Sequence, residues 1–118
     1  TWEKRIDQAF KTELSVPGHH LEWILNAKNI DDALAKLDGF RLDGVVQKMR
    51  CPFLLTHGAD DKQIPRRDAR ALFNAVGSKD KTFKLFTVEE GGAQHCQRDN
   101  LSIGTTYMFD WLKEKLGA

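Results

Sequence analysis

The chain has 118 residues, of which 41% are apolar, 30% are charged and 9% are aromatic, and its formal net charge is +1. These values are typical of one soluble globular unit. With 18 Lys and Arg residues against 17 Asp and Glu residues, the charge balance favours neither nucleic acid nor a membrane surface as a partner. No segment approaches the roughly 18 consecutive apolar residues of a membrane-spanning helix.

The two cysteines, Cys51 and Cys96, indicate a reducing compartment. They are too few for a disulfide scaffold, and they lack the paired spacing of a zinc site. We therefore expect a cytoplasmic protein without a bound metal. The first residues are charged, contain no apolar signal core and include no initiator methionine, so we expect the chain to be a piece of a longer protein.

The first fifty residues predict four helices separated by short breaks, because apolar residues recur there at helical spacing. Asn29 or Asp31 is the expected N-cap of the third helix, and Gly39 is its expected end. The four segments cover about residues 2–14, 21–25, 30–37 and 42–49.

From Cys51 onward the pattern changes to alternating strands and helices. Residues 53–57 form a short apolar run before Gly58, which is typical of a buried strand, and residues 82–88 alternate enough for a second strand. This order of strand, helix, strand and helix predicts a right-handed crossover with parallel strands. The apolar faces expected for the two helices consist of Ala69, Leu72, Phe73 and Val76 in the first and of Met108, Trp111 and Leu112 in the last.

Asp61 and His95 stand out because each follows the carboxyl end of a predicted strand. In a parallel sheet, functional side chains gather in these loops, and neighbouring strands lie only about 4.8 Å apart. A carboxylate bonded to an imidazole holds the ring in one tautomer while the other ring nitrogen takes a proton from a nucleophile. We therefore expect an Asp61 oxygen within about 3 Å of the His95 ring nitrogen nearest the main chain.

Two segments carry a resemblance to a known family. Residues 57–65, His-Gly-Ala-Asp-Asp-Lys-Gln-Ile-Pro, resemble the acid-bearing turn of α/β-hydrolases, Gly-x-x-Asp-x-x-Val/Ile-Pro, in which Asp61 takes the place of the acid. Residues 91–96, Gly-Gly-Ala-Gln-His-Cys, resemble the histidine loop of the same family. The order of acid and then histidine also agrees with the family's order of Ser, Asp or Glu, and His.

A narrower resemblance links residues 63–65, 95–96 and 99–100 to the group of dihydropseudooxynicotine hydrolases and fungal polyketide-shortening hydrolases, which cleave carbon–carbon bonds. The resemblance implies an α/β fold, with residues 41–118 as the C-terminal part of an α/β-hydrolase domain and residues 1–40 as cap or connecting helices. It implies that Asp61 and His95 are the acid and the base of a serine hydrolase. An ester or an activated carbon–carbon bond of a small-molecule substrate is then the expected target, with no cofactor.

The nucleophile that the family requires is missing from the sequence. The chain has three serines, Ser15, Ser78 and Ser102, and none lies in a Gly-x-Ser-x-Gly elbow. We expect the remainder of a parent hydrolase to supply the nucleophile and the oxyanion hole, so this chain alone should not turn over substrate. A two-stranded sheet cut from a larger one exposes an edge that seeks a partner. We therefore expect either a homodimer or order only beside the parent protein.

Other interpretations of these residues remain open. Asp61 could cap the helix that starts near Pro65, and His95 could be an ordinary loop histidine. Cys96 as a nucleophile is disfavoured because consecutive residues seldom face one another. The whole segment could also be a non-catalytic interaction or dimerisation module that keeps a hydrolase-like fold.

Overall fold

The computed structural model describes residues 19–117 of the chain. The chain divides into two compact units, Thr1–Leu42 and Asp43–Ala118, and each is described by itself. The sequence analysis placed this division after residue 40. The helix expected over residues 2–14 lies outside the described residues. None of the described helices is long and apolar enough to cross a membrane.

The described part of the first unit is a pair of short helices, α2 (His19–Ile24) and α3 (Ile30–Leu37). As expected, Asn29 is the N-cap of α3, where its side-chain oxygen accepts a hydrogen bond of 2.9 Å from the main-chain N–H of Asp32. Ala33 is fully buried between the helices. The second and third predicted helices are therefore present with nearly the expected bounds.

The fourth predicted helix, over residues 42–49, is wrong. Only a single turn of 3₁₀-helix, η1 (Val46–Lys48), forms there. Gly44 has φ of +74°, which lies in the left-handed region and cannot continue an α-helix. The apolar spacing of this segment matches a helix, but Gly44 adopts a non-helical backbone conformation and glycine has a low helix propensity.

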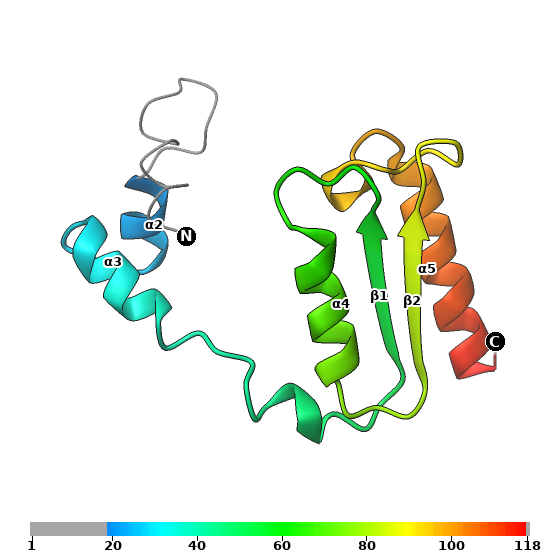
Figure 1. The fold of residues 1–118 in the computed structure, drawn as a ribbon, viewed down its shortest axis with the longest axis horizontal. Coiled ribbons are helices and arrows are strands. Elements are labelled where there is room, and N and C mark those ends of the chain that lie inside the picture. The colour runs from blue at the N-terminus through cyan, green and yellow to red at the C-terminus, as the bar shows by residue number, and fades with distance from the viewer. Residues whose placement is uncertain (1–18, 118) are drawn as a thin grey trace. The chain divides into compact units, whose positions relative to one another are not determined.

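The second unit contains a parallel two-stranded sheet, as predicted (Figure 1). Strand β1 (Phe53–Gly58) pairs in register with strand β2 (Lys81–Phe86), so that Gly58 lies opposite Phe86. Helix α4 (Arg66–Ala75) connects the two strands and helix α5 (Leu101–Leu116) follows β2. The two carboxyl ends of the strands therefore meet at one edge, and both exit loops begin there.

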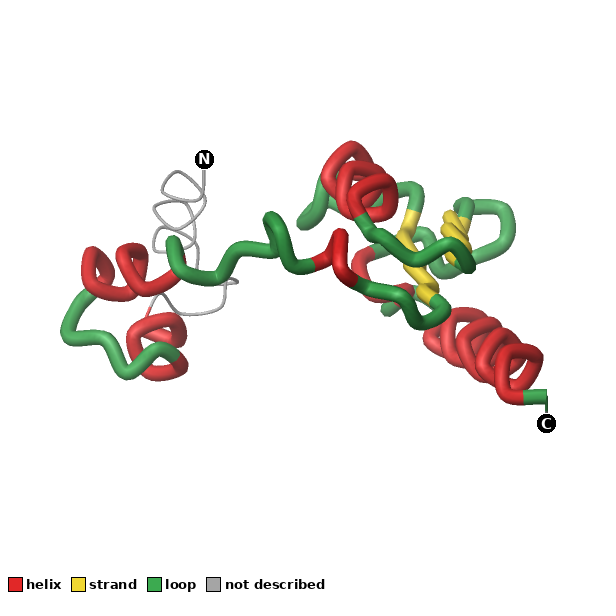
Figure 2. The backbone as a smooth tube through the Cα atoms, turned by 90° about the horizontal axis from the view of Figure 1, so that it is seen from below, coloured by secondary structure: helices red, strands yellow, loops and turns green. Residues whose placement is uncertain are grey.

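The two helices cover opposite faces of the sheet (Figure 2). Two residues of β2, three positions apart, show why, since successive side chains of a strand point to opposite faces. Phe83 packs against Phe73 of α4, with ring centroids 5.6 Å apart. Phe86 is fully buried and meets Tyr107 of α5 edge-on at 5.9 Å. Helices α4 and α5 thus hold the sheet between them, and this determines where its carboxyl edge lies.

The inward face of α5 differs from the prediction. Trp111 does face the sheet, where its Nε1 donates to Thr82 Oγ1 at 3.1 Å. Met108 and Leu112, however, are 38% and 44% exposed. Gly104, seven residues before Trp111 and so on the same face, is buried beside Gln97, and the next apolar stripe faces outward. That stripe consists of Leu101, Met108, Phe109, Leu112 and Leu116.

Candidate active site

Asp61 organises the loop that leaves β1. Its Oδ1 accepts hydrogen bonds from the main-chain N–H groups of Gln63, at 2.8 Å, and Ile64, at 2.9 Å. A short carboxylate side chain that bonds to the main chain two and three residues later closes a tight turn. The other oxygen, Oδ2, is left pointing away from the turn and is available to a group from outside the loop.

His95 lies in the loop that leaves β2, at the start of the 3₁₀ turn η2 (His95–Gln97). Two features shape this loop before it reaches the histidine. Gly92 has φ of +76°, a conformation that favours glycine. The carboxylate of Asp99 then accepts from the main-chain N–H groups of Ala93, at 2.9 Å, and Gln94, at 3.0 Å. Asp99 therefore holds the two residues that immediately precede His95.

The structure brings Asp61 and His95 together. His95 Nδ1 lies 2.9 Å from Asp61 Oδ2, which is the distance expected from the sequence. The Asp61 side chain is only 4% exposed, whereas that of His95 is 31% exposed. The acid is thus buried behind the imidazole, and the Nε2 side of the ring is the part that remains for a reacting group.

The main chain joins the two exit loops directly. The N–H of Ala59 donates to Phe86 O at 2.8 Å, and the N–H of Asp60 donates to Ala93 O at 2.9 Å. This approach requires glycine at position 58, because a Cβ atom there would lie 2.1 Å from Ala93 O. The glycine that ends β1 therefore sets the separation of the loops that carry Asp61 and His95.

The surroundings of Asp61 lower the pKa of its carboxyl group. Burial acts in the opposite direction and raises this pKa, but the hydrogen bonds outweigh it. The donors are the main-chain N–H of Ile64, the His95 ring and the main-chain N–H of Gln63. Asp61 is therefore ionised at neutral pH, which is the state that an acid must have to stabilise an imidazolium.

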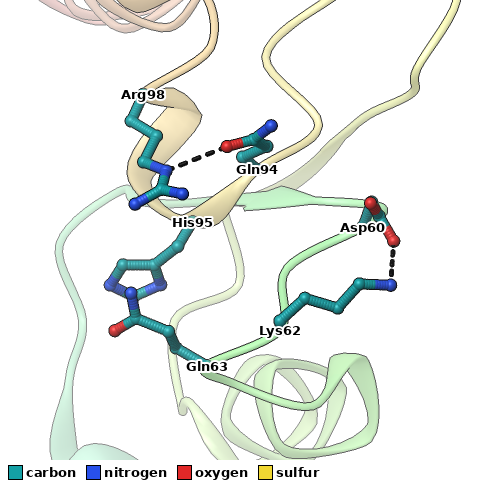
Figure 3. A pocket seen from close by; sticks show the side chains of 6 residues that line it. All are labelled: Asp60, Lys62, Gln63, Gln94, His95 and Arg98. Atoms are coloured by element: carbon teal, nitrogen blue, oxygen red, sulfur yellow. Dashed lines mark hydrogen bonds and ion pairs between the residues drawn. The ribbon is translucent and has the colours of Figure 1, made fainter. Parts of the chain in front are cut away.

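Asp60, the neighbouring acid, takes no part in this pair. Its carboxylate forms an ion pair with Lys62 on the surface, and Figure 3 shows it turned away from His95. The spacing argument that favoured Asp61 over Asp60 thus agrees with the geometry. The capping alternative for Asp61 does not, because its hydrogen bonds close the preceding turn and the N-cap residue of α4, Pro65, makes no side-chain cap.

An open pocket of about 180 Å³ lies beside His95. The guanidinium of Arg98 is held at its rim, where Nε donates to Gln94 Oε1 at 2.9 Å. All of its lining residues are polar or charged, and both loops contribute to it (Figure 3). The lining residues are Asp60, Lys62, Gln63, Gln94, His95 and Arg98.

His57 is packed at the end of β1, as expected, and is 6% exposed. Its Nδ1 is 4.0 Å from Asp61 Oδ2, which is too long for a hydrogen bond. Cys96 is a free, exposed thiol next to His95. Sequence reasoning gave Asp99 no structural role, although an acid just before a predicted helix and shortly after a histidine is a signal for a loop-closing carboxylate.

Comparisons with known proteins find two similarities to hydrolases. A model of the family described as serine aminopeptidase S33, a hydrolase family, matches residues 40–89. The protein named hydrolase LUC6 from a Fusarium species is 30% identical over 103 residues, which cover 83% of this chain and 25% of that protein. Both matches support an assignment to the α/β-hydrolase superfamily.

The chain spans about a quarter of the length of this curated relative. The family match extends through η1, β1, α4 and β2 and includes Asp61, but it ends before His95. The position of the histidine relative to the acid therefore rests on the geometry of the two loops. The resemblance noted from residues 57–65 and 91–96 is confirmed at the level of the superfamily.

Proposed function

We propose that Asp61 and His95 are the acid and the base of a serine-hydrolase catalytic triad. The observation that carries this proposal is the hydrogen bond of 2.9 Å between His95 Nδ1 and the buried Asp61 Oδ2. It lies at the carboxyl edge of a parallel sheet, where such sites gather. The acid holds the imidazole in the tautomer whose Nε2 accepts a proton.

The nucleophile in this proposal comes from polypeptide outside these 118 residues. Ser78 is buried and its Oγ donates to Asp80 O at 2.9 Å, at the amino end of β2, whereas His95 follows the carboxyl end. Ser102 lies within α5, and Ser15 lies outside the described residues. This chain alone is therefore expected to be inactive.

The proposed reaction is hydrolysis of an ester or of an activated carbon–carbon bond in a small molecule. The serine oxygen attacks the carbonyl carbon as its proton passes to His95 Nε2, and the same proton then goes to the leaving group. Water, activated by His95, releases the acyl group. The pocket beside His95 is where substrate would meet the base, and no step of this mechanism calls for a metal or an organic cofactor.

The cytoplasm is the compartment that we propose for this enzyme. Cys51 and Cys96 are both free and exposed, and exposed free thiols persist best in a reducing compartment.

A fluorophosphonate probe tests the triad, because it labels only activated serines. We expect it to label one serine of the full-length protein, and we expect His95→Ala to abolish the labelling, while Asp60→Asn should affect it far less. Equal labelling of the wild type and of His95→Ala would refute the proposal. A Gly-x-Ser-x-Gly motif in the preceding polypeptide would support it, and a degenerate elbow would favour a non-catalytic module.

The exposed apolar stripe of α5 favours a second candidate, an interaction module. Phe109 is 66% exposed and Leu116 is 77% exposed, and β1 and β2 pair only with each other among the described residues. We propose that the remainder of the parent hydrolase covers these surfaces, with a homodimer as the alternative. Sedimentation of the purified chain distinguishes the two, since a dimer would support the homodimer and a chain that does not fold alone would support coverage by the parent hydrolase. A well-folded monomer at all concentrations would contradict both.

A further inference from the structure

Gln97 has an environment that sets it apart from the other residues around His95. It is a glutamine only 6% exposed, two residues after the histidine. Both Gln97 and Cys96 have φ of +53°, which is uncommon for residues other than glycine. Two successive left-handed residues turn the chain sharply, so that the His95 ring meets Asp61 while the Gln97 side chain enters the interior.

Two glycines form the walls of the socket that receives Gln97. A Cβ atom at Gly104 of α5 would lie 3.2 Å from Gln97 Cβ and 3.2 Å from its Oε1. A Cβ atom at Gly92 would lie 3.3 Å from Gln97 Cγ. These three distances are tighter than ordinary packing allows, so Gln97 fits only because both positions lack a side chain, and the main chain of the loop and of the helix borders it on two sides.

The socket also ties Gln97 to the sheet and to α5. Thr56 of β1 donates its hydroxyl to Gln97 Oε1 at 3.4 Å, a long contact that contributes less than the packing does. The main-chain oxygen of Gln97 accepts from the N–H of Asn100 at 2.9 Å, just before α5 begins. The residue therefore connects strand, loop and helix within two positions of His95.

We propose that Gln97 is a positioning residue for His95. Its buried side chain locks the left-handed turn and thereby sets the direction from which the imidazole approaches Asp61. The catalytic consequence rests on the proposed function, whereas the effect on the His95 to Asp61 hydrogen bond does not. A displacement of about 1 Å at a catalytic group lowers turnover by roughly 10²-fold.

The test compares Gln97→Ala with Gln97→Met in the full-length protein. The readouts are the low-field proton NMR signal of the His95 Nδ1–H bonded to Asp61, kcat and KM. We expect Gln97→Ala to weaken that signal and to lower kcat about 10²-fold, with little change in KM. Methionine refills the socket with a side chain of similar length, so Gln97→Met should recover most of both.

Gln47→Ala is the matched control, because Gln47 is an exposed glutamine of η1, at the amino end of β1 rather than at the site. Its signal and kcat should match the wild type. Should Gln97→Ala not fold, Gly104→Ala presses on Gln97 without removing it and should shift the same NMR signal. An unchanged signal in a folded Gln97→Ala, or in Gly104→Ala, would overturn the proposal.

The NMR measurement also separates this proposal from the hydrolase function. If the wild type shows the NMR signal but no turnover, and Gln97→Ala loses the signal, the hydrolase function alone is refuted. If the wild type turns over substrate, and Gln97→Ala changes neither the NMR signal nor kcat, the role of Gln97 alone is refuted.

Discussion

The loops after β1 and β2 each position one side chain of the candidate site, but they are held in place in different ways. In the first, Asp61 both closes the turn and contacts His95. In the second, these duties are divided, because Asp99 and the buried Gln97 hold the main chain while His95 meets the acid. Loss of the Asp61 side chain therefore removes the turn and the contact with His95 together, whereas in the second loop a supporting side chain can be changed while the His95 side chain itself is kept.

The largest expected effect comes from Asp61→Asn. The asparagine oxygen can still accept from Gln63 and Ile64, so the turn should remain, but its amide favours the wrong tautomer of His95. Turnover should fall by about 10⁴-fold, with little change in unfolding temperature. Steady-state kinetics with a thermal melt checks both halves of this statement.

Asp61→Ala sharpens the contrast, because it removes the turn as well as the tautomer control. We expect the same loss of turnover together with a lower melting temperature. If Asp61→Asn destabilised the protein as much as Asp61→Ala, the two duties of this side chain would not be separable as described.

The junction of the two loops is the next most sensitive point. At Gly58 a new Cβ would meet the main-chain oxygen of Ala93 at 2.1 Å, and main chain cannot move aside locally. We expect Gly58→Ala to lower the free energy of unfolding by about 3 kcal/mol and to separate Asp61 from His95. Chemical denaturation and turnover are the measurements.

Gly44→Ala is the control for Gly58→Ala. Gly44 has φ of +74° but has nothing within 4 Å of an added Cβ, so only its backbone conformation is penalised, by about 1 kcal/mol. An equal cost at both positions would show that close approach of the loops is not what requires glycine at position 58.

Acid pH should weaken both loops. The pKa values of Asp61 and Asp99 are lowered in the folded protein, since the main-chain hydrogen bonds that each accepts outweigh burial, which raises them. The stability that they contribute is complete above the unfolded pKa of about 3.9 and is lost as pH falls through the lower folded values. The unfolded state binds more protons in that range, so stability decreases with falling pH.

Denaturation across pH 2 to about 6 measures this slope. Asp61→Asn and Asp99→Asn should each make it shallower. A slope that neither substitution alters would contradict the role of these carboxylates.

The smallest effect is expected at Cys96. Its φ of +53° favours glycine, so Cys96→Gly should stabilise the second loop by a few tenths of a kcal/mol, after the greater freedom of glycine in the unfolded chain is subtracted. Cys51→Gly is the matched control, because φ is not positive at Cys51, and it should destabilise. The free energies of unfolding of the two variants decide this comparison.

The sequence by itself determined the two strands, the connecting helix and the acid and histidine at their carboxyl ends. Each of these depends on local patterns: an apolar run between Pro52 and Gly58, helical spacing after Pro65, and the order of Asp61 and His95 along the chain. Parallel pairing then follows from the crossover, and the contact between the two side chains follows from the spacing of neighbouring strands.

Only the tertiary structure decided which apolar residues face inward and how the second loop is held. The spacing of apolar residues in α5 fits two faces, and the one that packs inward carries Trp111 and the buried Gly104. Asp99 accepts hydrogen bonds from main-chain N–H groups of the loop, and Gln97 occupies space that is open because Gly92 and Gly104 have no side chains. These features have no periodic pattern in the sequence, because they depend on where the packed elements bring main chain and side chain together.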